Sequence, residues 1–205
     1  MSRFDRAADA ATDRLTRQIA FVVELDKLKQ VLRQTLLIDR SRQENDAEHS
    51  WHLAAMVLVL GEYAAPGVDL LRVLEMLVIH DVVEIDAGDT FLYDGAGVDG
   101  QAAREAAAAD RLYGLLPADQ GAALRALWQE FEAGETPDAR FARALDRLQP
   151  LLHNYHTEGA MWRAHGVRAA DVLAKKAVIE RGAPALWRYA EGLIRECIAK
   201  GWLAA

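Results

Sequence analysis

The stretch DLLRVLEMLVIHDVVE, residues 69–84, combines the pattern of a buried helix with two residues that are costly to bury. Val73 and Met76 recur at helical spacing and mark one apolar face of that helix. His80 continues this face into the interior, and Asp81 follows it directly. Because buried polar and charged groups need partners, this stretch predicts a helical fold with a polar site inside it.

The rest of the chain carries the same helical signature, since Ala, Leu, Arg and Glu dominate and apolar residues keep helical spacing. No segment alternates convincingly as a strand would, so we expect an all-α fold, a helical bundle with additional C-terminal helices. Asn45, Asp69 and Thr136 are expected to cap helices, with Glu48 completing a capping box at the first of them. The expected helices span residues 4–17, 19–34, 46–64, 69–84, 99–115, 118–133, 137–156, 168–181 and 184–199.

Composition limits the class of protein further. With 205 residues, 52% of them apolar, the chain suits one domain with a sizeable core. No apolar run reaches the roughly 18 residues of a membrane span, and the N-terminus lacks a signal-peptide pattern. A single cysteine, Cys197, fits a buried position in a reducing cytoplasm, and the net charge of −7 argues against binding of duplex nucleic acid. We therefore expect a cytoplasmic protein that binds neither a membrane nor duplex nucleic acid.

Two further segments direct polar residues toward the predicted core. His49 precedes Leu53 at helical spacing, and Asp146 adjoins Leu145 in a later amphipathic segment. Such residues are costly to bury singly, but together they satisfy one another around a divalent ion. A single histidine on an apolar face is more often an ordinary core residue, and residues from separate helices need not converge. The pattern alone leaves a metal site and an ordinary polar core open.

Two more carboxylates follow the His-Asp pair. Glu84 lies four residues after His80, on the same helical face, where a carboxylate can orient or deprotonate a water molecule. Asp89 follows Gly88 in the longest irregular segment, residues 85–98. Long loops in compact helical domains are usually functional or mobile, so Asp89 is a further candidate for the same site.

The ordered set of His49, the pair His80-Asp81 and Asp146 resembles the HD-domain metal-dependent phosphohydrolases. The pattern of that family is a histidine on one helix, an adjacent His-Asp on a later helix and a distant aspartate. The resemblance covers roughly residues 25–157 and implies an all-helical HD domain. It also implies that these four residues hold one divalent ion, with Mn, Co, Fe, Ni, Mg and Zn all open as its identity.

The motifs AEHS at residues 47–50, HDVVE at 80–84 and GD at 88–89 look like the branch that contains the 5′-deoxynucleotidases. This resemblance implies hydrolysis of (deoxy)nucleoside 5′-monophosphates to a nucleoside and phosphate by a metal-activated water. It implies Glu84 as the catalytic acid or base, with Asp89 beside the reacting phosphate or nucleoside. The alternatives are a phosphodiesterase or nucleoside triphosphate hydrolase on the same site, or a non-catalytic helical binding protein stabilised by metal.

The resemblance implies that the substrate is a nucleotide, a small phosphorylated molecule. We expect an arginine to bind its phosphate, because a guanidinium group can donate two parallel hydrogen bonds to phosphate oxygens. Members of this branch carry an Arg-Trp pair upstream of the first histidine, and the arginine contacts phosphate. The nearest counterpart here is Arg33, which no tryptophan follows. Arg40 and Arg42 compete for the same role, with a solvated loop as their ordinary interpretation.

The domain organisation follows from these expectations. We expect a single HD-type domain over residues 1–205, with an HD core at about 25–157 and a helical extension at 158–205. The apolar, tryptophan-containing helices at 184–202 offer a surface through which a homodimer could form.

Overall fold

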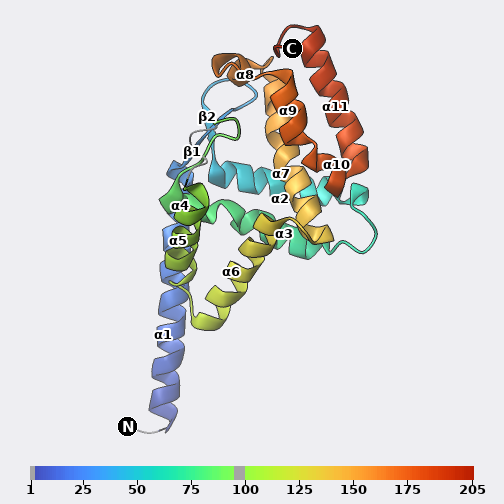
Figure 1. Cartoon of the computed structure of the whole chain (residues 1–205). Coiled ribbons are helices and arrows are strands. Elements are labelled where there is room, and N and C mark those ends of the chain that lie inside the picture. The colour runs from blue at the N-terminus through green and yellow to red at the C-terminus, as the bar shows by residue number, and fades with distance from the viewer. Residues whose placement is uncertain (1–2, 95–99) are drawn as a thin grey trace.

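A computed structural model describes residues 3–94 and 100–205, most of which lie in helices (Figure 1). The α-helices are α1 (Arg3–Glu24), α2 (Asp46–Leu60), α3 (Leu70–Ile79), α4 (Glu84–Ala87), α5 (Gln101–Tyr113), α6 (Ala118–Ala133), α7 (Pro137–His156), α8 (Ala160–Ala164), α9 (Ala169–Lys176), α10 (Val178–Gly182) and α11 (Pro184–Ala199). Short 3-10 helices occupy η1 (Leu25–Gln30), η2 (Gly61–Tyr63) and η3 (His80–Val83), and the strands are β1 (Leu32–Leu36) and β2 (Gln43–Asn45). The helical fold class is confirmed, with one small sheet added to it.

Helix α7 is the element around which the others pack. It contacts α2, α3 and α6, which precede it in the sequence, and α10 and α11, which follow it. Helix α1 extends away from this assembly, with the N-terminus at its far end (Figure 1). Because α7 is surrounded, its apolar face is fully buried, as at Leu145 and Leu151. Any residue on that face of α7 is therefore held in place from several directions.

The small antiparallel sheet corrects the expectation that the chain forms no strand. Residues 19–34 are predicted as one helix, but the helix ends at Glu24, and β1 pairs with β2 so that Leu32 lies opposite Asn45. The Leu-Arg-Gln-Thr-Leu sequence of β1 does not alternate clearly, so its extended form depends on pairing with a distant segment rather than on local preference. The strand places Arg33 beside the interior.

The predicted helix at 69–84 changes its winding at the His-Asp pair. Helix α3 ends at Ile79, and His80 begins the tighter 3-10 turn η3. Adjacent side chains diverge by about 100° around a regular α-helix, so a helix end is where both can reach one point. His80 Nε2 accordingly lies 3.0 Å from Asp81 Oδ1. The irregular segment expected from residue 85 begins later, after α4, and residues 95–98 lie outside the described residues.

Helix caps fix where the site-bearing helices begin, and the three predicted caps are confirmed. Asn45 Oδ1 accepts from the Glu48 backbone N–H, and the Glu48 carboxylate accepts from the Asn45 N–H, which completes the capping box of α2. Asp69 accepts backbone hydrogen bonds at the start of α3, and Thr136 does so at the start of α7. The first of these caps holds His49 in the opening turn of α2.

Helix α11 packs its apolar side against the rest of the chain. Ile194 and Cys197 are fully buried there, which agrees with the interpretation of the cysteine as a core residue. Within the described residues, no helix is both long and apolar enough to cross a membrane.

The close packing of α10 on α7 leaves no room for a side chain at Gly182. A Cβ atom at that position would meet the backbone carbonyl oxygen of Arg140. We therefore expect Gly182→Ala to lower the free energy of unfolding by about 1–3 kcal/mol, the usual cost of overpacking. Urea unfolding followed by circular dichroism measures this change.

Gly192→Ala is the matched control for that prediction. Gly192 lies within α11, and a Cβ there has no neighbouring atom within 4 Å. The substitution should raise the free energy of unfolding by about 0.5–1 kcal/mol, because it removes the conformational freedom of a helical glycine. Two variants of equal stability would show that α10 is not held tightly against α7.

Candidate active site

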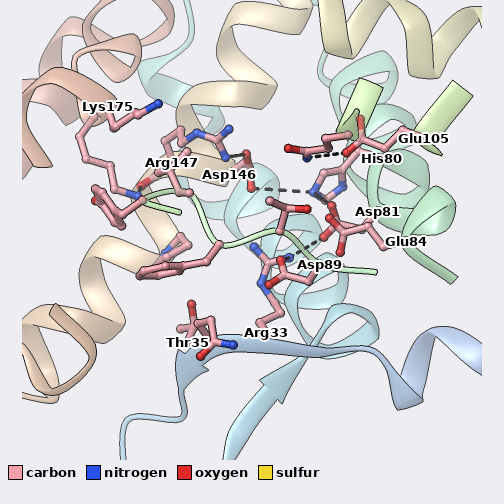
Figure 2. Close-up of a pocket in the computed structure, with 18 of the residues that line it drawn as sticks. Arg33, Thr35, His80, Asp81, Glu84, Asp89, Glu105, Asp146, Arg147 and Lys175 are labelled. Atoms are coloured by element: carbon pink, nitrogen blue, oxygen red, sulfur yellow. Dashed lines mark hydrogen bonds and ion pairs between the residues drawn. The ribbon is translucent and has the colours of Figure 1, made fainter. Parts of the chain in front are cut away.

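The candidate site is a cavity of about 210 Å³ beside β1 and the end of α3, closed on its far side by α7 and α9 (Figure 2). Its wall includes His80, Asp81, Glu84, Asp89 and Asp146. Figure 2 shows the first two and the last of these side chains pointing toward one another. Residues that are distant along the chain thus share one polar enclosure.

The four predicted metal ligands converge at the inner end of this cavity. His49 Nε2 lies 3.1 Å from Asp146 Oδ1 and 3.9 Å from Asp81 Oδ2. His80 Nε2 lies 3.0 Å from Asp81 Oδ1 and 3.8 Å from Asp146 Oδ1. All four side chains are buried. Two imidazoles and two carboxylates around one point form a ligand set that suits a divalent transition metal.

The hydrogen bonding of His80 fits a cation at that point. Its Nδ1–H donates to the backbone carbonyl oxygen of Leu77 over 2.9 Å, so the neutral ring keeps a lone pair on Nε2. That Nε2 atom is buried and faces the carboxylates of Asp81 and Asp146, at 3.0 and 3.8 Å. Metal-binding imidazoles are commonly oriented by an acceptor behind the ring in this manner. The donor set present can therefore hold a divalent ion.

Burial and neighbouring charges set the protonation of these ligands. Burial lowers the pKa of His49 to about 4, so its imidazole is neutral near pH 7. Burial opposes ionisation of Asp146, but Arg147 and His49 hold the pKa of that carboxyl well below its usual range. Burial opposes ionisation of Asp81 too, but His80 and Arg33 together outweigh burial and lower the pKa of that carboxyl. Both aspartates are therefore ionised, as metal ligands must be.

Arg33 enters the cavity from β1. Its Nη1 atom lies 2.8 Å from Asp81 Oδ2 and 3.0 Å from Asp46 Oδ1. Only 11% of the Arg33 side chain is exposed, so these pairs are shielded from water. The guanidinium group thus balances the carboxylates next to the ligand set while its side chain still forms part of the cavity wall.

Arg40 and Arg42, the competing candidates for phosphate binding, lie outside the cavity. Arg40 pairs with Glu158 at 3.2 Å, and Arg42 pairs with Glu48 at 2.6 Å, all on the exposed surface. Neither arginine belongs to the cavity wall. Among the three predicted arginines, the structure brings Arg33 alone to the site.

Glu84 and Asp89 both belong to the cavity wall. The Oε2 atom of Glu84 is buried without a hydrogen-bond partner. Burial raises the pKa of Glu84, and the nearby carboxylates of Asp81 and Asp46 raise it further. The pKa of Asp89 is raised as well, chiefly by burial. A carboxyl group that keeps a proton beside a ligand set has the property that acid–base catalysis requires.

A basic wall opposite Arg33 was not singled out from the sequence. Arg147 pairs with Asp146 at 2.6 Å, and Lys176 is almost fully buried and donates to the Arg147 carbonyl oxygen at 2.8 Å. Burial lowers the pKa of Lys176 to about 7. Lys175 lines the same wall. The position of Arg147 directly after Asp146 is a sequence signal for its role, but the two lysines reach the cavity only through the packing of α9.

Gln149 is a further residue that sequence patterns could have found. It lies three residues after Asp146 on α7, and helical spacing places the two on neighbouring positions of one face. Its side chain is fully buried, and its Oε1 atom lies 3.1 Å from His49 Nδ1.

Together these features define a helical protein with a buried His/Asp site that can hold a divalent ion. The HD domain family model matches residues 25–187, which is most of the chain. The chain therefore belongs to the HD domain family.

Known proteins similar to this chain agree with that assignment. The crystal structure of a "predicted metal-dependent phosphohydrolase" from Magnetospirillum magnetotacticum is 58% identical, with a TM-score of 0.92 over 94% of this chain and 97% of that one. The human 5′-deoxynucleotidase HDDC2 is 27% identical over 54% of this chain and 53% of its own length. The chain thus spans about half the length of the curated relatives it matches. A Pyrococcus horikoshii protein, 20% identical with a TM-score of 0.62 over 86% of this chain and 98% of that one, shares the fold.

The protonation of His80 predicts a pH dependence of metal binding. Burial disfavours the charged ring, but Asp81 and Asp146 outweigh it and raise the pKa of His80 to about 9. Below that pH an incoming ion must displace a proton, so the apparent affinity for Mn²⁺ should rise with pH, by up to about tenfold per unit, and level off near pH 9. Calorimetric titrations in buffers of different ionisation enthalpy measure the affinity and the released proton. An affinity that is independent of pH, without proton release, would contradict the prediction.

Proposed function

We propose that this protein is a metal-dependent phosphohydrolase that converts (deoxy)nucleoside 5′-monophosphates to nucleosides and inorganic phosphate. The observation that carries the proposal is that Glu84, Asp89 and Arg33 share one cavity with His80, Asp81 and Asp146, and that His49 lies directly behind these three residues. A purely structural metal site does not need additional ionisable groups beside a filled ligand set. The similarity to proteins named 5′-deoxynucleotidases supports the substrate class.

The ligand set and the cavity together suit a phosphate ester. His49, His80, Asp81 and Asp146 would hold the divalent ion, which supplies positive charge to the phosphate and makes water more acidic. The cavity of about 210 Å³ lies below the roughly 300–1,000 Å³ of typical ligand pockets, which favours a small substrate over a polymer.

Arg33 binds the phosphate of the substrate in this proposal. Its hydrogen bonds to Asp81 and Asp46 hold the guanidinium group in a fixed position, so little conformational freedom is lost when a phosphate oxygen accepts from it. Arg147 and Lys175 add positive charge on the opposite wall of the cavity. These cations counteract the repulsion between the phosphate and the surrounding carboxylates.

Glu84 moves the proton in the reaction. Its raised pKa, which burial causes and Asp81 and Asp46 increase, lets it give a proton to the 5′-oxygen of the leaving nucleoside. In the ionised form, the same carboxylate can take a proton from the attacking water. Asp89 lies 3.8 Å from Arg33 Nη1 on the wall of the cavity, where it orients the phosphate or the sugar.

A panel of substrates tests the proposal. Purified protein is supplied in turn with Mn²⁺, Co²⁺, Mg²⁺, Ni²⁺ or Fe²⁺ and offered deoxynucleoside monophosphates, ribonucleoside monophosphates, cyclic nucleotides and nucleoside triphosphates. We expect phosphate release from the 5′-monophosphates. Turnover of cyclic nucleotides or triphosphates alone would establish one of the alternative hydrolases, and no turnover with any metal would refute the enzymatic proposal.

Metal binding and catalysis should separate in two variants. His80→Ala removes a ligand and should abolish both metal binding and turnover. Glu84→Gln should retain the metal, measured by calorimetry, and lose about 10²–10⁴-fold in kcat, the usual contribution of a general acid or base. Glu132→Gln is the matched control, since Glu132 lines the same cavity without an assigned role. Unchanged kcat in Glu84→Gln would remove Glu84 from the mechanism.

The arginine assignment has its own test. Arg33→Gln should lower kcat/KM for a nucleoside monophosphate by about 10–100-fold, because a hydrogen bond to a charged group contributes about 1.5–3 kcal/mol. Arg42→Gln should leave kcat/KM unchanged, because Arg42 lies on the surface in a pair with Glu48. The reverse result would move the phosphate-binding role to Arg42.

A further inference from the structure

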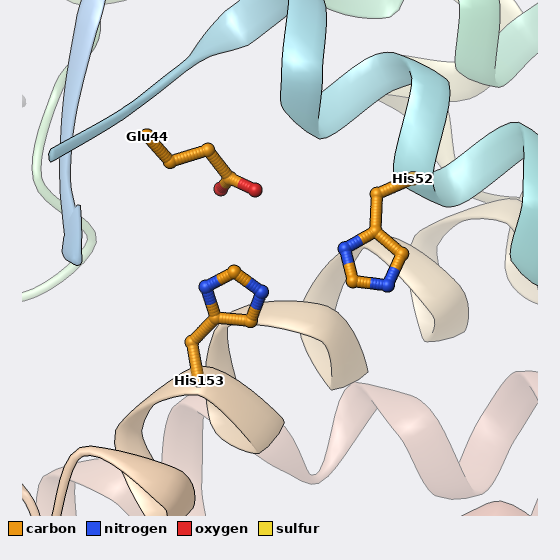
Figure 3. A group of neighbouring side chains, drawn as sticks. All are labelled: Glu44, His52 and His153. Carbon is orange, nitrogen blue, oxygen red and sulfur yellow. The ribbon is translucent and has the colours of Figure 1, made fainter. Parts of the chain in front are cut away.

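Behind His49, away from the cavity, lies a second cluster of potential metal ligands. Glu44 of β2, His52 of α2 and His153 of α7 bring ligand atoms to within 4.8 Å of one another (Figure 3). Glu44 and His153 are buried, and His52 is half-buried. Such a cluster can bind a second ion, or it can bind a hydrogen-bond donor from the protein itself.

The side-chain amide of Gln149 is that donor. Its Nε2 atom lies 2.7 Å from Glu44 Oε1, 3.1 Å from His153 Nε2 and 3.3 Å from His52 Nδ1. The amide nitrogen thus stands where the three acceptors converge. A metal ion would have to displace it before it could bind there.

The acceptors allow this amide one orientation. His153 Nδ1 lies 2.9 Å from the carbonyl oxygen of Leu36, which can only accept, so Nδ1 carries the ring proton and Nε2 is an acceptor. Glu44 Oε1 is the second acceptor that faces the amide nitrogen. If the amide were rotated by 180°, its oxygen would face these two acceptor atoms and could form a hydrogen bond with neither. The nitrogen of Gln149 therefore faces the cluster, and its oxygen must face the other way.

That oxygen determines the protonation of His49. Gln149 Oε1 lies 3.1 Å from His49 Nδ1 and can only accept, so Nδ1 must carry a proton. The neutral ring then has its lone pair on Nε2, 3.1 Å from the Asp146 carboxylate. Two such electron-rich atoms at this distance fit a shared cation between them.

We infer that Gln149 is a positioning residue, which the Glu44–His153 pair holds in one orientation so that His49 presents the lone pair of Nε2 to the divalent ion. The inference rests on the proposed metal site, but its central element, a proton on His49 Nδ1, is a property of the polypeptide that can be observed without metal. The Glu44–His52–His153 cluster then serves to orient this amide and binds no ion of its own.

Two substitutions separate this role from simple packing. Gln149→Met keeps the length of the side chain and removes the acceptor for His49. Gln149→Glu, as the protonated acid that burial beside Glu44 favours, keeps that acceptor and a donor toward Glu44. In ¹⁵N-histidine spectra of the metal-free protein, His49 Nδ1 should carry a proton in the parent and in Gln149→Glu. In Gln149→Met the proton should move to Nε2, which can donate to Asp146. Loss of signals in His49→Gln assigns the resonances.

Metal affinity provides the second measurement. Gln149→Met should weaken Mn²⁺ binding by about 10–100-fold, the usual effect of losing a group that orients a ligand, and Gln149→Glu should remain within a few-fold of the parent. Thr157→Val is the matched control: Thr157 is the buried C-cap residue of α7, and its hydroxyl bonds only to backbone carbonyls of that helix. Its affinity for Mn²⁺ should equal that of the parent.

Three results would overturn the inference. They are an unprotonated His49 Nδ1 in the parent protein, equal His49 protonation in the parent and in Gln149→Met, and a second bound equivalent of Mn²⁺ that disappears in His52→Ala. If Gln149→Met fails to fold, the spectra of the parent protein and of Gln149→Glu still decide the question. A protein that shows the predicted His49 proton but no phosphatase activity would refute the proposed function and leave the role of Gln149 intact.

Discussion

The balance of buried charge at the inner end of the cavity is the constraint on which the rest of the structure depends. Asp46, Asp81 and Asp146 are almost completely removed from water, and an uncompensated charge in such a place is strongly unfavourable. Arg33 bonds to two of these carboxylates, and the two site histidines bring atoms capable of sharing a cation. The helices α2, α3 and α7, far apart in the sequence, are therefore tied together through polar groups as well as through apolar packing.

The polar groups form layers that extend inward from the cavity. The ligand atoms come first, followed by the acceptors and donors that orient them, such as the Leu77 carbonyl oxygen behind His80 and the Gln149 amide behind His49. Behind that amide lie Glu44 and His153, the latter fixed by a strand carbonyl. Each layer limits the hydrogen-bonding choices of the one before it, so the β1–β2 sheet contributes to the site without touching the ion position.

Sequence patterns predicted what is local in this fold and missed what is not. The helices and their caps at Asn45 and Thr136 depend on spacing within a few residues, and the structure contains them. The strand β1 depends on pairing with residues 7 to 13 positions away, and its own residues are also compatible with a helix, so the sequence pattern did not predict it. At the site, ordered motifs pointed to residues that do converge, and the roles assigned to them remain predictions. The buried position of Arg33, and of Lys176 from α9, follows from tertiary packing that no local pattern encodes.

Proline at position 150 has a further consequence for α7. A helix interior proline supplies no backbone N–H, so the carbonyl group of Asp146, four residues earlier, lacks its usual helical donor. Lys176 donates to the carbonyl oxygen of the next residue, Arg147, and thereby links α9 to the turn of α7 that has lost this hydrogen bond. Detachment of α9 would remove that support from the turn that carries Asp146. Lys176 thus links α9 to the turn of α7 that carries Asp146, and amide hydrogen exchange in this turn should follow the opening of α9 rather than the fraying of α7 itself.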